Sequence, residues 1–236
     1  MKRLSEVLKQ KTAPRILDIG TGSGQFIHLI QESCNHYSAI VGVDTHEKAI
    51  ERAIESQKDP RVSFELMNVY DYDKEPFDVV CLSNSLHHFE EPDKILELMV
   101  TLTKDEGYII FNEMYQDSQN DKQMTHVGLH HFWASIDRLH DVVHKETYKK
   151  KEIIDLLTAA PKTELLDSWN LDFEEEQTLK PEDYTMLKNS VTNSLKRIEQ
   201  YDGYEQYEKT GNILINRIDE IGFESATQLM VVLKKS

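Results

Sequence analysis

The chain has 236 residues, with 27 lysines and arginines against 42 aspartates and glutamates, so its formal net charge is −15. This acidic balance argues against a general nucleic-acid binder, which needs a cationic face for the phosphates. No run approaches the roughly 18 apolar residues of a membrane span, and the N-terminus lacks the apolar segment of a secretory signal. Only two isolated cysteines are present, so no disulfide framework is expected. We therefore expect a cytoplasmic protein that binds neither membranes nor nucleic acids.

The first half of the chain alternates between short apolar segments and helical patterns. The apolar segments are rich in Val, Ile or Phe, which is typical of strands buried on both faces. Between them, apolar residues such as Phe26, Leu29 and Ile30 recur at helical spacing, and Pro92 is well placed to begin a helix. This alternation predicts a parallel sheet with helices on both faces. The predicted strands are 15–19, 39–43, 62–68, 77–83 and 107–113.

Beyond residue 114 the pattern becomes mainly helical. In chain order it predicts a loop over 114–120, a helix with a break over 123–144, a helix over 151–157 and a sixth strand over 163–171. The acidic run 173–177 (FEEEQ) is predicted to be solvated. Two amphipathic helices then fill 181–222, divided near Gly203, and a closing strand spans 226–233. The apolar stripe of the first of these helices could pack against the body, form a homodimer surface or cover a substrate.

A glycine-rich loop joins the first strand to the first helix. The segment Asp18-Ile19-Gly20-Thr21-Gly22-Ser23-Gly24 lets backbone N–H groups approach a ligand at a helix N-terminus. The spacing is G-x-G-x-G, and Gln25 stands where a dinucleotide-binding loop has its third glycine or alanine. The carboxylate of Asp18 suits a ligand with an ammonium group better than one with a pyrophosphate.

Polar residues also end the next three strands. Asp44 lies 20 residues after Gly24, where a carboxylate can accept hydrogen bonds from both ribose hydroxyls. Asn68 and Val69 end the third strand and could contact an adenine edge, and Ser83 ends the fourth. Because ligands of open α/β sheets bind outside the carboxyl ends of the strands, these residues predict one shared cleft. Taken singly, the loop could be a tight turn and Asp44 a helix cap.

These pieces together resemble the class I S-adenosylmethionine-dependent methyltransferases, of the branch that acts on small molecules. The resemblance covers about half of the chain, from Arg15 to Asn112. The matching segments are the glycine loop, the end of the second strand at 41–44 (VGVD), the third strand end at 64–69, the fourth strand and the turn after it at 77–89 (FDVV to LHHF), and 102–107. It implies a Rossmann-like α/β three-layer sandwich with a seven-stranded, mostly parallel sheet whose last strand is antiparallel. The helices of 181–222 then form an insertion before that strand. We expect a single domain over 1–236, with 114–148 as a lid or substrate-binding segment.

The resemblance also implies roles for individual residues. S-adenosylmethionine would be the cofactor and S-adenosylhomocysteine the product, with Asp18 orienting the methionine ammonium and Asp44 binding the ribose hydroxyls. The family usually has an aspartate at the position of Asn68, which can still accept a hydrogen bond through its carbonyl oxygen but carries no charge. The predicted cofactor-binding residues are Asp18, Gly20, Thr21, Gly22, Gly24, Asp44, Thr45, Asn68, Val69 and Ser83.

Ten histidines are many for this length. A histidine titrates near neutrality, so His87, His88 or His130 could act as the general base of a methyl transfer, or these residues could only shape the pocket. Two histidines four positions apart on a helix can bind one metal ion, and both the cluster at 126–131 and the pair His140 and His144 have this spacing. A carboxylate such as Glu113 or Asp137 would complete such a site. No complete ligand motif is visible, so the sequence predicts no metal site.

The predicted function is methyl transfer from S-adenosylmethionine to an O, N or C atom of a small-molecule acceptor by in-line displacement. The segment 83–86 (SNSL) lacks the Asn/Asp-Pro-Pro-aromatic pattern of methylases that act on nucleic-acid bases or on protein glutamine. Two alternatives stay open. One is a non-catalytic interaction module that retains the cofactor pocket. The other is a dinucleotide-dependent enzyme on the same sheet.

Overall fold

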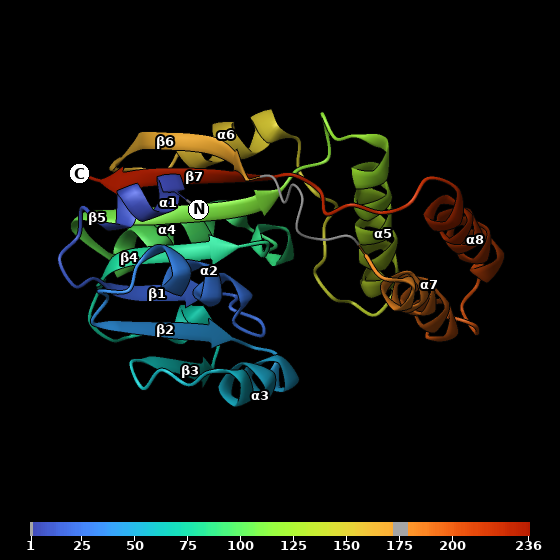
Figure 1. The fold of residues 1–236 in the computed structure, drawn as a ribbon, viewed down its shortest axis with the longest axis horizontal. Helices are drawn as coiled ribbons and strands as arrows, with labels where there is room; N and C mark the ends of the chain where they lie inside the picture. Colours follow the sequence, from blue (N-terminus) through green and yellow to red (C-terminus); the bar gives the residue numbers. More distant parts are fainter. Residues whose placement is uncertain (1, 172–178) are drawn as a thin grey trace.

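The computed structural model describes residues 2–171 and 179–236, and in these the strands form one seven-stranded sheet (Figure 1). The strand order is β3-β2-β1-β4-β5-β7-β6, in which β1 to β5 are parallel and β7 runs antiparallel to both β5 and β6. The predicted fold class is therefore confirmed. The strands are β1 (Arg15–Ile19), β2 (Ala39–Asp44), β3 (Val62–Leu66), β4 (Phe77–Ser83), β5 (Thr103–Met114), β6 (Thr163–Leu171) and β7 (Gln228–Lys235).

Helices cover both faces of the sheet because successive strand residues point to opposite sides. In β1, Leu17 and Ile19 join an apolar cluster with α4 and α6, whereas Ile16 joins a second cluster with α1 and α2. The covering helices are α1 (Lys2–Leu8), α2 (Gln25–Ser33), α3 (Glu47–Ser56), α4 (Pro92–Leu102) and α6 (Lys150–Thr158). The central strands β1, β2, β4, β5 and β7 are thus largely buried on both faces, as their apolar runs predict, whereas the edge strands β3 and β6 are partly exposed.

Three further helices lie apart from the sheet, and we call them the cap helices. They are α5 (Asp121–Arg138), α7 (Pro181–Lys196) and α8 (Tyr204–Glu220). Their apolar faces pack on one another in a separate cluster, which includes Leu129, Val191 and Leu214. In Figure 1 the arrowheads of β1, β2, β4 and β5 point toward these helices, so the cap helices lie beyond the carboxyl ends of the parallel strands.

The predicted elements match the structure closely, with a few differences. The helix predicted over 123–144 ends at Arg138, because the chain turns there and Asp141 adopts a positive φ of 57°. His140 and His144 consequently lie in a loop and not on a common helix, so that part of the prediction is wrong. The predicted division near Gly203 is confirmed, since Gly203 is the N-cap of α8 with a φ of 81°. The acidic run 173–177 lies outside the described residues.

Two short 3-10 helices follow β3 and β4, and both end at the same edge of the sheet. They are η1 (Val69–Asp71) and η2 (Leu86–His88).

Among the described residues, none of the helices combines the length and apolar character that crossing a membrane would require.

Candidate active site

The glycine loop between β1 and α2 is held in a backbone conformation that other residues rarely adopt. Gly20 and Gly22 have φ values of 65° and 53°, in the left-handed region. A Cβ on Gly20 would lie 2.5 Å from the hydroxyl oxygen of Ser85, whereas a Cβ on Gly22 would meet no atom within 4 Å. The loop is therefore packed on one side and open on the side of Gly22.

Gly24 has a different role from the other two glycines. It is the N-cap residue of α2, with a φ of 82°, and a Cβ there would lie 3.2 Å from the ring of Phe64. It lets the start of α2 approach β3, and it does not line the cavity described below. The structure thus separates Gly24 from the residues that can touch a ligand directly.

Asp18 lies beneath the loop and is 1% exposed. Its Oδ2 accepts a hydrogen bond of 2.7 Å from the Thr21 hydroxyl, while its Oδ1 is buried with no hydrogen-bond partner among the described residues. Burial raises the pKa of Asp18 to about 7; the Thr21 hydrogen bond opposes this shift and the charge of Asp44 adds to it. A buried carboxylate with an unpaired oxygen is a place where a cationic ligand gains binding energy.

A cavity of about 1070 Å³ opens at the carboxyl ends of β1 to β4. Small-molecule sites usually have volumes of about 300–1,000 Å³, so this one has room for a nucleoside cofactor and a second ligand. The predicted residues that line it are Gly20, Thr21, Gly22, Asp44, Thr45, Asn68, Val69, Ser83 and His88. The structure brings these nine together, while Asp18, Gly24, His87 and His130 are not among the lining residues.

Two lining side chains already bond to the neighbouring backbone. The carboxylate of Asp44 accepts hydrogen bonds of 2.8 Å from the N–H groups of Gly22 and His46. The carbonyl oxygen of Asn68 accepts one of 3.1 Å from the N–H of Tyr70, which caps η1. Carboxylate and carbonyl oxygens have further lone pairs, so both groups can still accept bonds from a ligand.

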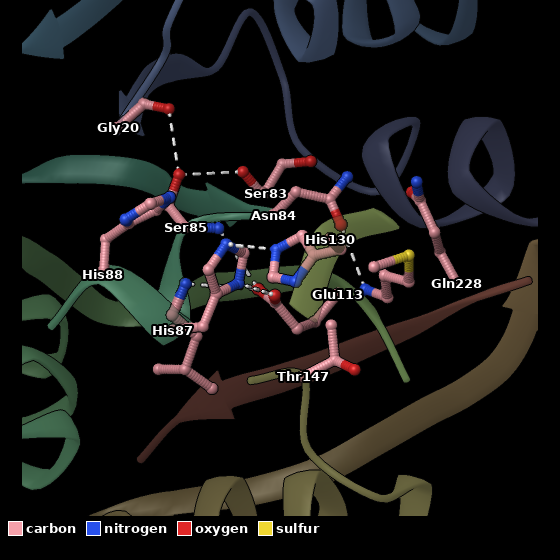
Figure 2. Close-up of polar contacts among 12 residues, drawn as sticks. Gly20, Ser83, Asn84, Ser85, His87, His88, Glu113, His130, Thr147 and Gln228 are labelled. Atoms are coloured by element: carbon pink, nitrogen blue, oxygen red, sulfur yellow. Dashed lines mark hydrogen bonds and ion pairs between the residues drawn. The ribbon is translucent and has the colours of Figure 1, made fainter. Parts of the chain in front are cut away.

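Behind the cavity, the buried carboxylate of Glu113 at the end of β5 organises the turn after β4. Its Oε2 accepts hydrogen bonds of 3.2 Å from the N–H groups of Ser85 and Leu86, and its Oε1 lies 2.6 Å from Nδ1 of His87 (Figure 2). Glu113 is 1% exposed and His87 4% exposed. The Ser85 hydroxyl in turn donates to the carbonyl oxygen of Gly20 at 3.1 Å. This network fixes the turn against the glycine loop.

Two more histidines approach His87 from the cap helix α5 and from the loop that follows it. Nε2 of His130 lies 3.2 Å from Nε2 of His87 and 3.3 Å from Nε2 of His144. Nδ1 of His144 lies 2.8 Å from Oδ2 of Asp137, whose other oxygen accepts a bond of 2.8 Å from Arg197. Burial and, to a smaller extent, the neighbouring His87 and His144 together lower the pKa of His130 to about 2. Burial likewise lowers the pKa of His144, although its bond to Asp137 opposes the shift.

His88 stands between this cluster and the cavity. Its ring packs against the rings of His87 and His144, with centroid distances of 4.4 and 4.3 Å. Desolvation and the proximity of His87 and His144 lower the pKa of His88 to about 4, so its imidazole is neutral at neutral pH. Among the three histidines that the sequence predicts as general bases, His88 is the one that lines the cavity.

No pattern in the sequence predicts the association of His144 with His87 or the hydrogen bond from Ser85 to the glycine loop. His87 and His144 are 57 positions apart and the segment around His144 is not helical, so no periodic pattern could pair them. The sequence offers Glu113 and Asp137 as carboxylates near a metal, and in the structure each carboxylate lies within hydrogen-bond distance of a histidine ring nitrogen.

Comparisons with known proteins agree with this geometry. The sequence matches the family described as "Methyltransferase domain" over residues 10–189. A comparison with curated proteins gave no significant match.

Solved structures with the same fold include YjhP from E. coli, with 18% identity and a TM-score of 0.60 over 99% of this chain and 91% of YjhP. The N-methyltransferase NodS from Bradyrhizobium japonicum WM9, solved in complex with S-adenosyl-L-homocysteine, has 13% identity and a TM-score of 0.54 over 99% of this chain and 82% of NodS. The [4+2]-cyclase SpnF has 16% identity and a TM-score of 0.58 over 99% of this chain and 80% of SpnF. At these identities the structures support the fold, and the family match extends over most of the chain. The chain therefore belongs to the methyltransferase domain family, that of the class I S-adenosylmethionine-dependent methyltransferases, whose methyl donor is S-adenosylmethionine.

Proposed function

We propose that this chain transfers the methyl group of S-adenosylmethionine to an O, N or C atom of a small-molecule acceptor and releases S-adenosylhomocysteine. The observation that carries the proposal is the cavity at the strand ends, in which the glycine loop, Asp44 and Asn68 lie side by side. These groups match the three polar parts of the cofactor, namely the methionine end, the ribose and the adenine.

The residues fit a bound cofactor in detail. Asp18 has a buried Oδ1 without a partner, which suits the positive charge of the methionine ammonium, directly or through a water. The space in front of Gly22 is open, so the loop backbone can lie close to a ligand. Asp44 would accept hydrogen bonds from the ribose hydroxyls, and Asn68 with Val69 would contact the adenine. Thr45 and Ser83 also line the cavity. The cofactor supplies an electrophilic methyl group on its sulfonium.

The acceptor would bind at the other end of the cavity, where the loop after α5 contributes Val142 and Val143. The lid or substrate role predicted for 114–148 is part of this proposal. The lining there includes the acidic side chains of Glu90, Glu91 and Asp137. The one lysine at this rim, among the lining residues that the structure describes, is Lys94, which is paired with Glu91 at 2.6 Å. An acidic rim favours a neutral or cationic acceptor over an anionic one and disfavours nucleic acid.

His88 is the residue that we propose to contact the acceptor. A neutral imidazole can accept a hydrogen bond from an O–H or N–H group and so orient its lone pair for in-line attack. Its low pKa makes it a weak base, so positioning contributes more than proton removal. His87 and His130 would act from behind His88 and not on the reacting atoms. The general-base roles of His87 and His130 stay predictions.

Calorimetric titration tests the proposal. The protein should bind S-adenosylhomocysteine tightly and NAD weakly or not at all, whereas tight NAD binding would favour the dinucleotide enzyme.

Methyl transfer itself needs a separate activity assay, because one structural neighbour is named a [4+2]-cyclase and a fold does not fix the chemistry of its members. Incubation with S-adenosylmethionine and a panel of small amines, phenols and other nucleophiles should yield S-adenosylhomocysteine with at least one acceptor. Binding without turnover on any acceptor would favour the interaction module.

A homodimer through the C-terminal helices also remains a proposal. Met186 on α7 and Ile213 on α8 are exposed apolar residues that such an interface could cover. Sedimentation velocity of the purified protein distinguishes monomer from dimer.

A further inference from the structure

Three imidazole nitrogens converge at the junction between the sheet and the cap helices. Nε2 of His130 is 3.2 Å from Nε2 of His87 and 3.3 Å from Nε2 of His144, and one nitrogen from each ring lies within 4.8 Å of the other two. Figure 2 shows the rings of His87 and His130 next to each other beside Glu113, and their planes are nearly perpendicular, at 85°. Two nitrogens bound to one tetrahedral zinc ion at about 2.0–2.1 Å are about 3.3–3.4 Å apart. The two Nε2–Nε2 separations that involve His130 are close to this value.

The carboxylates next to the cluster determine which ring atoms carry hydrogen. An ionised carboxylate only accepts hydrogen bonds, so Nδ1 of His87 donates to Glu113 and Nδ1 of His144 donates to Asp137. In a neutral ring, Nε2 then carries a lone pair. Histidines that bind metals typically show this arrangement, in which a carboxylate fixes the tautomer and orients the ring toward the ion.

Hydrogen bonding within the cluster does not account for these contacts. Nε2 of His130 faces the lone pairs of both His87 and His144, and with its ring neutral it has at most one hydrogen to donate. Nδ1 of His130 is buried without a partner among the described residues, so no carboxylate fixes the tautomer of this ring, and its Nε2 is able to present a lone pair. A single cation at the centre would instead be bound by three lone pairs, one from each ring.

We propose that His87, His130 and His144 form a three-histidine site for a divalent metal ion of the zinc class, with Glu113 and Asp137 orienting two of the ligands. Three neutral imidazoles without a thiolate favour zinc, or copper, nickel and iron, over magnesium and calcium, which prefer oxygen ligands. Three protein ligands leave a fourth position of a tetrahedral ion open for water or another ligand.

The ligands come from different parts of the fold, which gives the ion a defined structural effect. His87 lies in η2 on the sheet body, His130 lies on cap helix α5, and His144 lies in the loop that follows α5. An ion bound by all three would join the cap to the sheet beside the cavity. The ring of His88 lies between the three ligands and the cavity. The ion would therefore fix the acceptor end of the cavity without contacting a bound acceptor.

The first experiment uses the full chain, stripped of metal with a chelator and titrated with zinc chloride. One equivalent of zinc should bind, and at about a hundred times its Kd the melting temperature should rise by about 5–10 °C. Cobalt(II) should give the visible absorption bands of a tetrahedral site, and magnesium should cause no change in either measurement. An absence of zinc binding by protein that is shown by circular dichroism to be folded would overturn the proposal.

Substitutions then locate the site. His130→Gln should abolish the cobalt spectrum and the zinc-dependent rise in melting temperature. Asp137→Asn should weaken zinc binding by about 10–100-fold, because it acts through His144. The matched control is His140→Asn, which replaces a histidine of the same segment outside the cluster and should leave zinc affinity within twofold.

The outcomes separate this site from adventitious binding and from the cofactor site. Zinc binding that survives His130→Gln, or that is lost in His140→Asn, would refute the assigned ligands. If His130→Gln does not fold, the Asp137→Asn affinity and the cobalt spectrum of the native chain decide the question. The titration with S-adenosylhomocysteine is independent, so either proposal can fail while the other stands.

Discussion

The backbone N–H of Gly22 donates a hydrogen bond of 2.8 Å to the carboxylate of Asp44, which ties the glycine loop after β1 to the end of β2. The same carboxylate accepts from the N–H of His46 and so also fixes the start of the segment that leads into α3. Asp44 therefore shapes the cavity wall and presents charge to it. These two contributions can be separated experimentally.

Replacing Asp44 by Ala removes the carboxylate from the cavity, and Asp44→Asn keeps one acceptor oxygen but no charge. Because a hydrogen bond to a charged group contributes about 1.5–3 kcal/mol, we expect the affinity for S-adenosylhomocysteine to fall about 10-fold or more in Asp44→Asn and about 100-fold or more in Asp44→Ala. Calorimetry measures both. Glu47→Ala, at an exposed position at the start of α3, is the control and should bind normally. Affinity within twofold of the native value in Asp44→Ala would exclude the ribose-binding role.

The open side of Gly22 leads to a second prediction. In Gly22→Ala the new methyl group would meet no protein atom and would project into space that we assign to the cofactor. We expect a loss of about 1–2 kcal/mol in stability from the positive φ, together with a large loss of S-adenosylhomocysteine affinity. Gly203→Ala is a close control, since Gly203 also has a positive φ and no atom near its Cβ position but caps α8 far from the cavity. It should lose similar stability, measured by chemical denaturation, and bind the ligand normally.

The buried carboxyl of Asp18 gives the ligand-free protein a defined dependence on pH. Its pKa rises from 3.8 to about 7 on folding, so between these values the folded state binds more protons than the unfolded state. The contribution of Asp18 to stability is then present at low pH and decreases as the pH rises from about 4 to about 7. Asp18→Asn should remove this component. Thermal unfolding of the two proteins at pH 5 and pH 8 measures the difference, and identical pH profiles would contradict the assignment.

Ligand binding should show the opposite trend with pH. If Asp18 binds the methionine ammonium as a carboxylate, the affinity for S-adenosylhomocysteine should rise with pH between about 6 and 8 as the carboxyl ionises. In Asp18→Asn the affinity should be lower and should not change over this range. Calorimetric titrations at pH 6, 7 and 8 compare the two proteins. A native affinity that does not depend on pH would indicate that Asp18 is already ionised or does not contact the ligand.

The cap helices form their own apolar cluster, so their stability can be changed without altering the sheet. Leu214 on α8 is 6% exposed within this cluster, and Leu214→Ala should cost about 2–5 kcal/mol through lost burial and the cavity left behind. Its neighbour Ile213 is 56% exposed, and Ile213→Ala should change the free energy of unfolding by less than about 1 kcal/mol. Urea denaturation measures both. Equal effects would show that the cap does not pack as described.

The sheet and the cofactor cavity could be predicted from the sequence because their determinants are local. The run 39–43 was predicted as a strand and forms β2 (Ala39–Asp44), since a continuous apolar run in a βαβ pattern has few alternatives. The glycine loop was recognised from its spacing, and nine of the predicted residues line one cavity because parallel strands end at the same edge. The N-terminal helix α1 (Lys2–Leu8) was not predicted. It has only seven residues, which is too few for its apolar residues to show a helical repeat.

The histidine cluster could not be predicted from spacing. His87 enters it because the 3-10 turn η2 directs its ring toward Glu113, and His144 enters it from a loop that begins where α5 stops. These placements depend on the packing of the cap against the sheet. The sequence pairs His140 with His144 by helical spacing, but the turn at Asp141 breaks that pairing and leaves His140 next to Tyr201.

The strand order has a consequence for how the chain is made. Within the described sheet, β6 pairs with β7 alone, and β7 follows every other described element in sequence. During translation, β1 to β5 can assemble as they leave the ribosome. A nascent chain that has not yet exposed β7 leaves β6 unpaired and the edge of β5 open, which is a template for association with other chains. Ribosome stalling or truncation before Gln228 should therefore yield a product with a formed cofactor cavity and a strong tendency to aggregate.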